Sequence, residues 1–276
     1  MEKGNLYLIA TPIGNLEDIT LRAINTLKEV DIIAAEDTRH SLKLLNHLNI
    51  SKPLISYHRH NEDVKTKELI ALLSQGKNVG LITDAGTPGI SDPGEEVVKQ
   101  AIENDINIIP IPGACAAINA LISSGMSTKE FIFYGFLPLN KKLREEKFED
   151  IKRQNKTIII YEAPHRIKST LKEINEKFGN IKIVLAKEIT KIHEEFIRGN
   201  IEEIINNIQE PKGEYIIIFE IKGKSEKQIE MENLNKLTIE EQYNYYEKMG
   251  LNKKEIIKKI AKNNNVPKDT IYKKFI

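Results

Sequence analysis

The stretch DAGTPGISDPG, residues 84–94, follows the apolar run NVGLI, residues 78–82, with only Thr83 between them. It is rich in glycine and proline, although the run before it has the composition of a regular strand. Gly86 and Gly89 lack a Cβ and can adopt positive φ, whereas the two prolines hold φ near about −65°. The stretch therefore predicts a stiff loop of unusual path at the end of a strand, which a ligand can approach closely.

A purely structural interpretation of this loop is open at the level of the sequence. Asp92 can serve as the N-cap of a following helix, with Pro93 in the first turn of that helix. Ligands of open parallel sheets, however, bind outside the carboxyl ends of the strands. The fold in which the stretch lies thus decides between a plain turn and a ligand loop.

Apolar runs alternate with amphipathic segments in the first half of the chain. A helix-like segment over 18–30 separates the first two of the four runs, which are LYLIA (6–10), DIIAA (31–35), NVGLIT (78–83) and INIIPIP (106–112). Strands that are almost wholly apolar and are spaced by helices indicate parallel β-α-β units with both faces covered. The first half is therefore predicted to be an α/β domain with a parallel sheet.

The spacing of the apolar runs changes after about residue 120. Some of the runs that follow have connections short enough for antiparallel pairing. These runs are TIIIYEA (157–163), IKIVLAKEI (181–189), EEFIRGN (194–200) and EYIIIFEI (214–221). We expect two α/β domains, over residues 1–118 and 119–222, the second with a mixed sheet. A small helical segment is expected over 223–276.

Composition places few further restrictions on function. The chain of 276 residues has 41 basic and 40 acidic side chains, a net charge of +1, so its overall field does not indicate a nucleic-acid partner. No apolar stretch approaches the ~18 residues of a membrane span, and the amino terminus has no long apolar signal region. The single cysteine, Cys115, excludes an intrachain disulfide framework. We expect a cytoplasmic protein with no membrane partner.

Glycine- and proline-rich loops also follow other predicted strands, at ATPIGNLED (10–18), AEDTRH (35–40) and PIPGACAA (110–117). None matches the dinucleotide fingerprint G-x-G-x-x-G or the P-loop pattern. Together with DAGTPGISDPG, SYHRHNE, GFLP, YEAPHR and KEITKIHEEFIRG, these loops resemble, in order and spacing, the bacterial small-subunit ribosomal RNA cytidine 2′-O-methyltransferases of the tetrapyrrole-methylase fold. The resemblance covers about residues 5 to 221.

This resemblance implies two α/β domains with a cleft between them, in which S-adenosylmethionine lies folded against loops. It assigns cofactor contacts to Thr11, Pro12, Gly14, Asp84, Gly86, Thr87, Pro88, Ile90, Ala114, Cys115, Ala116 and Ala117. The chain departs from the family pattern where alanine and cysteine stand at 114 and 115, since proline and serine are expected there. A cysteine is close to serine in size, so the packing is expected to be kept.

The reaction implied is methyl transfer from a sulfonium to a ribose 2′-OH, for which the protein aligns the hydroxyl and helps to remove its proton. Candidates for that work are the ionisable residues of the motifs, with the two arginines as phosphate or ribose clamps. They are Glu36, Asp37, Arg39, Glu162, His165, Arg166, Lys187 and Glu188. His58 and His60 are assigned to RNA contact, because two histidines without a third ligand are a weak indication of a metal. No metal site is expected.

Each motif also has a structural interpretation that the sequence leaves open. AEDTRH can be a helix N-terminus with Asp37 or Thr38 as its cap, which makes Arg39 a surface residue. In YEAPHR, Pro164 can start a helix that holds His165 and Arg166 in its first turn, where phosphate is attracted, or the motif can be a plain turn.

The carboxyl-terminal segment reads as helix, glycine turn, helix, asparagine-rich turn and helix, which resembles a helix-turn-helix. Residues 251–276 hold eight lysines against Glu255 and Asp269, and 8 − 2 gives a local charge of +6. Such clustering favours a phosphate-backbone partner, although a solvated lysine-rich tail fits equally well. The lysines assigned to RNA binding are Lys253, Lys254, Lys258, Lys259 and Lys262.

The function expected from the resemblance is S-adenosylmethionine-dependent 2′-O-methylation of a cytidine in small-subunit ribosomal RNA by a homodimer. Two other functions stay open. One is a tetrapyrrole C-methyltransferase of the same fold, and the other is a non-catalytic RNA-binding protein, which leaves the cleft motifs unexplained.

Overall fold

A parallel sheet forms the core of the amino-terminal half in the computed structural model, which describes residues 2–208, 211–221, 234, 237–264 and 266–275. Its five strands run in the order β3-β2-β4-β1-β5, and each pair is parallel. The strands are β1 (Leu6–Ile9), β2 (Ile32–Ala35), β3 (Leu54–Ser56), β4 (Val79–Ile82) and β5 (Ile108–Ile111). The parallel α/β prediction for this half is confirmed, with β3 as a strand that the sequence analysis missed.

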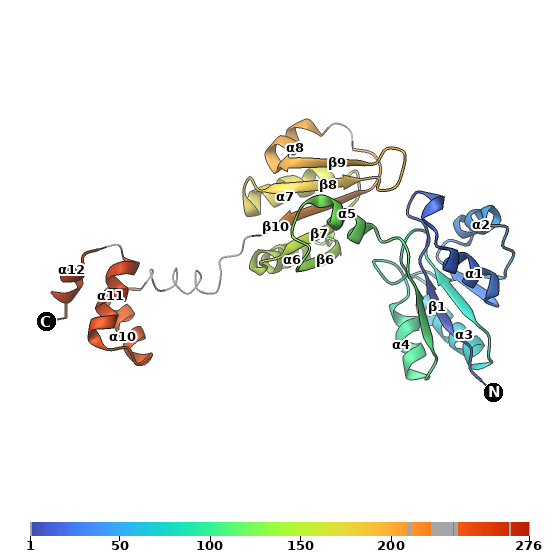
Figure 1. Cartoon of the computed structure of the whole chain (residues 1–276), viewed down its shortest axis with the longest axis horizontal. Coiled ribbons are helices and arrows are strands. Elements are labelled where there is room, and N and C mark those ends of the chain that lie inside the picture. Colours follow the sequence, from blue (N-terminus) through green and yellow to red (C-terminus); the bar gives the residue numbers. More distant parts are fainter. Residues whose placement is uncertain (1, 209–210, 222–233, 235–236, 265, 276) are drawn as a thin grey trace. The chain divides into compact units, whose positions relative to one another are not determined.

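Helices cover both faces of this sheet (Figure 1). One face packs against α1 (Leu21–Glu29) and α2 (Thr38–His47), which follow the short helix η1 (Leu16–Asp18). The other face packs against α3 (Glu62–Ser74) and α4 (Glu95–Glu103). Because both faces are buried, the strands are apolar along their whole length, as in the fully buried β4.

The second sheet is mixed, as predicted, and runs in the order β6-β7-β10-β8-β9. β6 pairs with β7 in parallel, and the other neighbours are antiparallel. The strands are β6 (Phe131–Phe136), β7 (Thr157–Glu162), β8 (Lys182–Lys187), β9 (Glu195–Asn200) and β10 (Tyr215–Glu220). β6 was also missed by the sequence analysis.

One face of the mixed sheet packs against α6 (Lys141–Arg153), α7 (Ile167–Phe178) and α8 (Ile201–Asn207). The other face packs against α5 (Ala116–Ser124) and against Ile13, which comes from the loop after β1. That loop is close to the second sheet, because a Cβ added to Gly14 would lie 2.4 Å from Lys191 Cγ. The described residues up to Ile221, apart from 153–155, belong to one compact unit.

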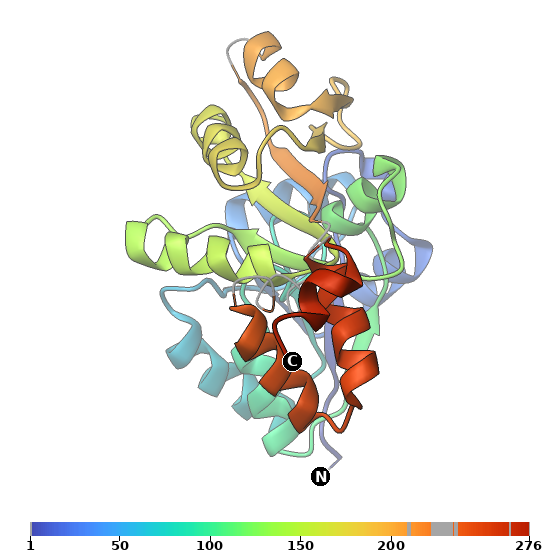
Figure 2. The ribbon, with the colours of Figure 1, turned by 90° about the vertical axis from the view of Figure 1, so that its left-hand side faces the viewer.

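The carboxyl-terminal unit holds α10 (Ile239–Lys248), α11 (Lys253–Asn263) and α12 (Lys268–Tyr272). Figure 2 shows these three helices close together. Their buried residues, such as Ile256, Ile260 and Ile271, form a core of their own. Thr238 and Asn252 start α10 and α11 with capping boxes completed by glutamates. The predicted boundary at residues 222 and 223 lies outside the described residues. No helix in the described part of the chain is long and apolar enough to span a membrane.

Candidate active site

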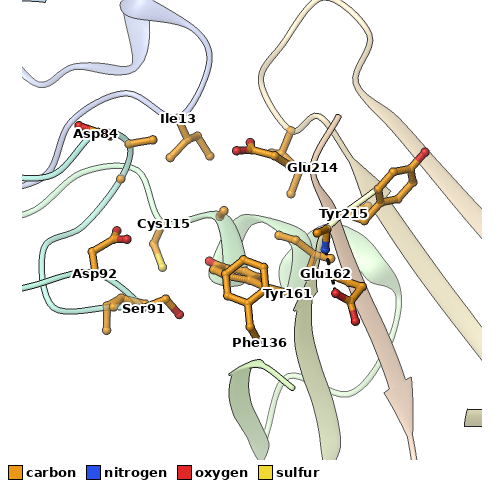
Figure 3. Close-up of a pocket in the computed structure, with 18 of the residues that line it drawn as sticks. Ile13, Asp84, Ser91, Asp92, Cys115, Phe136, Tyr161, Glu162, Glu214 and Tyr215 are labelled. Carbon is orange, nitrogen blue, oxygen red and sulfur yellow. Dashed lines mark hydrogen bonds between the residues drawn. The ribbon is translucent and has the colours of Figure 1, made fainter. Parts of the chain in front are cut away.

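A cavity of about 450 Å³ opens where the ends of the strands of both sheets meet. From the parallel sheet and its loops it is lined by Ile13, Glu36, Asp84, Ala85, Gly86, Thr87, Ile90, Ser91, Asp92, Cys115 and Ala116. From the mixed sheet it is lined by Phe136, Tyr161, Glu162, Ala163, Pro164, Ala186, Glu188, Ile189, Glu214, Tyr215 and Ile216. Figure 3 shows Asp84, Asp92 and Cys115 on one side of this cavity, with Phe136, Tyr161 and Glu214 on the other.

Backbone hydrogen bonds join the loop after β4 to two neighbouring loops. Thr11 N donates to Gly86 O at 2.9 Å, and Gly86 N returns a bond to Thr11 O at 3.1 Å. Thr87 Oγ1 donates to Ala114 O at 3.0 Å. Gly86 has a φ of +88°, which a residue with a Cβ rarely adopts. The loops that the motifs singled out are therefore fixed to one another at one wall of the cavity.

The path of residues 84–94 contradicts the interpretation of Asp92 as a helix cap. α4 begins at Glu95, and its N-cap is Gly94 with a φ of 144°. Gly94 N donates instead to Glu62 Oε1 at 3.0 Å. Because Gly94 takes the cap position, Pro93 lies outside the helix and the Asp92 side chain is left to line the cavity.

Three carboxylates, of Glu36, Asp84 and Asp92, lie together at this wall. Burial raises the pKa of Asp92 to about 6, and the charges of Glu36 and Asp84 add to the effect. Burial and Asp84 also raise the pKa of Glu36. Within the described part of the chain, the Asp92 carboxylate makes no hydrogen bond or ion pair, whereas Asp84 Oδ1 accepts a bond from Asp37 N at 3.0 Å.

Arg59 supplies positive charge beside these three carboxylates. Its charge lowers the pKa of both Glu36 and Asp92. It lies in the turn after β3, outside the lining of the cavity, and its guanidinium donates to Ser91 O. Its side chain therefore holds the turn after β3 beside the loop 84–94. The same turn carries His58 and His60, whose rings are 6.0 Å apart.

Asp37 and Arg39 form an exposed pair at the start of α2. Asp37 caps the helix by accepting from Arg39 N, and Arg39 Nη2 lies 3.1 Å from Asp37 Oδ2. The hydrogen bonds from Arg39 lower the pKa of Asp37 to about 2. The Arg39 side chain is 90% exposed. Asp37 is thus a stable anion outside the cavity lining, and Arg39 is accessible to a large ligand.

Glu162 is held in a buried network on the opposite wall. Its side chain is fully buried, with Arg166 Nε 3.2 Å from Oε1 and Thr170 Oγ1 donating to Oε2 at 2.6 Å. Arg166 also donates to Leu137 O at 3.0 Å, which fixes the GFLP segment. The expectation that Pro164 starts a helix is wrong. α7 begins at Ile167 with Arg166 as its N-cap, and 164–166 form the turn before it, with His165 exposed.

Lys191 forms ion pairs with two of the carboxylates on the mixed-sheet side. Its Nζ lies 2.9 Å from Glu188 Oε1 and 2.8 Å from Glu214 Oε2. Partial burial opposes ionisation of Glu188, but the hydrogen bonds from Lys191 and from Glu214 N outweigh it and lower the pKa of Glu188. Lys187 pairs with Glu195 at 3.5 Å and does not line the cavity.

Aromatic rings form the floor between the two walls. Tyr161 packs edge-on against Phe133 and Phe136, with ring centroids 4.8 and 5.7 Å apart. The Tyr161 hydroxyl accepts a hydrogen bond from Ala117 N at 3.0 Å, at the start of α5. Burial raises the pKa of Tyr161, so its hydroxyl stays neutral.

The structure brings together only part of the predicted site. The predicted residues that line the cavity are Glu36, Asp84, Gly86, Thr87, Ile90, Cys115, Ala116, Glu162 and Glu188. The remaining predicted residues are not among the lining residues, and they are Thr11, Pro12, Gly14, Asp37, Arg39, Pro88, Ala114, Ala117, His165, Arg166 and Lys187. His58 and His60 lie in a turn after β3 and not on a strand. The five predicted lysines belong to the carboxyl-terminal unit.

Sequence reasoning missed Asp92 as a cavity residue and missed Arg59, Tyr161 and Glu214 altogether. Asp92, Arg59 and Tyr161 stand inside the motifs DAGTPGISDPG, SYHRHNE and YEAPHR, so the sequence displays their side chains directly. Glu214 directly precedes β10, and the pairing of β10 with β7, which sets Tyr215 opposite Glu162, brings it to the cavity.

The electrostatic character of the cavity is that of a site for a cation. Six carboxylates line it, and no lysine, arginine or histidine is found among the described lining residues. Two cations, Lys191 and Arg166, form ion pairs with three of the six. Beside Glu36, Asp84 and Asp92 the positive charge comes from Arg59, and His58 also lowers the pKa of Glu36. Apolar side chains such as Ile13, Ile90 and Phe136 supply the remaining surface. A ligand that carries positive charge beside a flat apolar group fits this lining.

Comparison with known proteins identifies the family of the chain. Residues 5–205 match the family model of the tetrapyrrole (corrin/porphyrin) methylases. The ribosomal RNA small subunit methyltransferase I of Halalkalibacterium halodurans is 48% identical over 275 residues, 98% of this chain and 94% of that protein. The protein of the same name from Bacillus subtilis is 46% identical over 273 residues, 98% of this chain and 94% of that protein.

Solved structures share the fold at low identity. A diphthine synthase superposes with a TM-score of 0.64 at 12% identity, covering 80% of this chain and 90% of the other. A uroporphyrin III C-methyltransferase from Thermus thermophilus gives a TM-score of 0.57 at 15% identity, covering 79% of this chain and 98% of the other. The chain therefore belongs to the tetrapyrrole methylase family of methyltransferases and, within it, to the ribosomal RNA small subunit methyltransferase I group.

Proposed function

We propose that this protein transfers a methyl group from S-adenosylmethionine to the 2′-oxygen of a cytidine ribose in small-subunit ribosomal RNA. The observation that carries the proposal is the carboxylate-lined cavity, built from the loops that resemble the ribose methyltransferases. The names of the relatives, at 46% to 48% identity over nearly the whole chain, support a ribosomal RNA substrate.

The residues of the cavity fit this cofactor by their chemistry. S-Adenosylmethionine supplies a methyl group bound to a positively charged sulfur, and it also carries an ammonium group and a flat adenine. The carboxylates of Glu36, Asp84 and Asp92 complement positive charge, whereas Ile13 and Ile90 offer apolar surface to a ring. The cofactor contacts inferred from the resemblance remain proposals, with the lining residues Asp84, Gly86, Thr87, Ile90, Cys115 and Ala116 the strongest of them.

Asp92 is the group that we assign to removal of the 2′-OH proton. It lines the cavity without a hydrogen-bond partner among the described residues, and its pKa of about 6 leaves it ionised yet basic near neutral pH. Glu36 supports this role, because its negative charge holds the pKa of Asp92 up. Asp37 is poorly suited as a base, because Arg39 lowers its pKa to about 2.

The other predicted catalytic residues receive positioning roles. Glu162 and Arg166 are occupied with each other and with Leu137 O, so we assign them to holding the GFLP segment at the cavity. Arg39, which is 90% exposed next to the cavity loops, is the proposed contact for an RNA phosphate. Glu188 and Lys191 form a pair that holds Glu214 in place.

Methylation of a tetrapyrrole carbon is the second candidate, because the solved neighbours include uroporphyrin methyltransferases. Those matches, at 15% and 19% identity, support the fold alone. Tetrapyrroles of that class carry several carboxylates, and a cavity with six carboxylates repels them. The lining therefore favours RNA, whose contacts with the protein can be made outside the cavity.

The test is incubation of the protein with S-[methyl-³H]adenosylmethionine and either small ribosomal subunits or a uroporphyrinoid. We expect label in the RNA and none in the tetrapyrrole. Label in the tetrapyrrole alone would contradict the proposal. Sedimentation of the same preparation tests the further proposal, implied by the resemblance, that the protein is a homodimer.

A further inference from the structure

Helices α11 and α12 enclose a groove of about 610 Å³ in the carboxyl-terminal unit. Lys253, Lys254, Ile257 and Lys258 contribute to it from one face of α11, as expected from their helical spacing. α12 adds Lys268, Asp269 and Tyr272. The groove thus combines four ammonium groups with one carboxylate.

Positive charge is concentrated on these two helices. α10 carries Glu240, Glu241 and Glu247 against Lys248, which gives 1 − 3 = −2, whereas residues 251–276 carry +6. All eight lysines of that segment are exposed, and four of them line the groove. The other four, which lie outside the lining, are Lys259, Lys262, Lys273 and Lys274.

Tyr272 gives the groove an aromatic surface. It is 51% exposed, and its ring makes no aromatic or cation-π contact among the described residues, unlike Tyr243, which stacks on Phe275 at 4.4 Å. Ile257 and Ile271 are buried in the core of the unit, and this packing holds α11 and α12 together. An exposed aromatic ring inside a basic groove is the arrangement on which unpaired bases stack while lysines follow the phosphates.

We propose that the groove between α11 and α12 binds a single-stranded segment of RNA, with phosphates on the groove lysines and one base stacked on Tyr272. Duplex RNA keeps its base faces covered, so only an unpaired base can use this ring. The inference rests on the proposed function for its choice of RNA, and it adds a second, sequence-independent contact outside the cavity.

The test uses the full chain and two variants that each remove four positive charges. The groove variant replaces Lys253, Lys254, Lys258 and Lys268 by alanine, and the outer variant replaces Lys259, Lys262, Lys273 and Lys274. Binding of a fluorescein-labelled single-stranded RNA is measured by anisotropy over a range of KCl concentrations. If each groove lysine contacts a phosphate, the groove variant reduces the slope of log K against log salt by about 2 to 3. We expect less than half of that change in the outer variant.

Tyr272 is tested separately with single-stranded and duplex RNA. Tyr272→Ala is expected to weaken single-strand binding by about fivefold to 150-fold, the range of one stacked base, and Tyr272→Phe to restore it. Duplex binding should be unchanged by either substitution. Circular dichroism confirms that each variant is folded, and a lysine-to-glutamine set replaces any alanine set that is not.

Equal effects of the two four-lysine variants, or no effect of Tyr272→Ala, would overturn the inference. Failure of the proposed function is a different result, since it is read from methylation of ribosomal subunits by the unaltered protein. A protein that methylates the subunits but shows no preference between the lysine sets refutes the groove alone.

Discussion

Replacing Asp92 with asparagine should raise the stability of the fold at neutral pH and remove most of the methyl transfer. The carboxylate is partly buried beside Glu36 and Asp84, and it makes no hydrogen bond or ion pair among the described residues. Its negative charge is therefore unfavourable in the folded protein. If Asp92 had only a structural role, its replacement would instead lower the stability of the fold.

The magnitude follows from the pKa of Asp92, which rises from 3.8 to about 6 on folding. A difference of about two units corresponds to about 3 kcal/mol at most. Solvent screening at this half-buried position reduces the figure to about 1 to 2 kcal/mol. Because the folded-state pKa is raised, the unfavourable contribution is complete above pH 6, shrinks as the pH falls, and disappears below pH 3.8.

Denaturant unfolding of the unaltered protein and of Asp92→Asn at several values between pH 4 and pH 7.5 measures this contribution. The gain in the free energy of unfolding should be largest at pH 7.5 and close to zero at pH 4. Single-turnover methylation should fall by about a hundredfold or more, the usual contribution of a general base. Asp37→Asn is the matched control, since the pKa of Asp37 is lowered and no gain in stability is expected. A destabilised Asp92→Asn, or one with full activity, would refute the reasoning.

Three further predictions concern the neighbours of Asp92 and the walls of the cavity. Glu36→Gln should shift the midpoint of the pH–rate profile to lower pH, because the charge of Glu36 raises the pKa of Asp92. Arg59→Gln should shift it to higher pH, because the charge of Arg59 lowers that pKa. Shifts of the same sign would count against Asp92 as the titrating group. Arg39→Ala should weaken RNA binding and leave cofactor affinity by calorimetry unchanged, since its side chain is 90% exposed; equal loss of both affinities would make it a structural brace. Glu162→Gln should destabilise the fold by about 3 kcal/mol in denaturant unfolding, because it leaves Arg166 without its buried partner; an unchanged unfolding midpoint would exclude that role.

The sequence predicts most of the fold because its buried strands are continuous apolar runs. Four of the five parallel strands were found in this way, from LYLIA to INIIPIP. β3 was missed because it has only three residues, Leu54–Ser56, directly after Pro53. β6 was missed because its pairing with β7 is irregular between Phe133 and Phe136, where Gly135 has a φ of +61°, so no regular alternation marks it.

The sequence predicts those site residues that stand inside a recognisable loop motif. It does not predict residues that only the folded chain brings to the cavity. Gly86 and Thr87 line the cavity from a motif that the sequence displays directly. The sequence favours Asp92 as a cap, because an aspartate before proline commonly starts a helix. The positive φ of Gly94, which moves the start of the helix, follows from the path of the loop and not from local composition. Glu214, which directly precedes β10, reaches the cavity through the pairing of β10 with the distant strand β7.

Identification of the methylated nucleoside shows whether the protein methylates the ribose of a cytidine. Small-subunit ribosomal RNA labelled by this protein with S-[methyl-³H]adenosylmethionine is digested to nucleosides and separated by chromatography with mass detection. A parallel alkaline digestion shows whether the label blocks cleavage at its own position, as a 2′-O-methyl group must. We expect label in 2′-O-methylcytidine alone, within an alkali-resistant dinucleotide. Label on a base, or in another nucleoside, would contradict it.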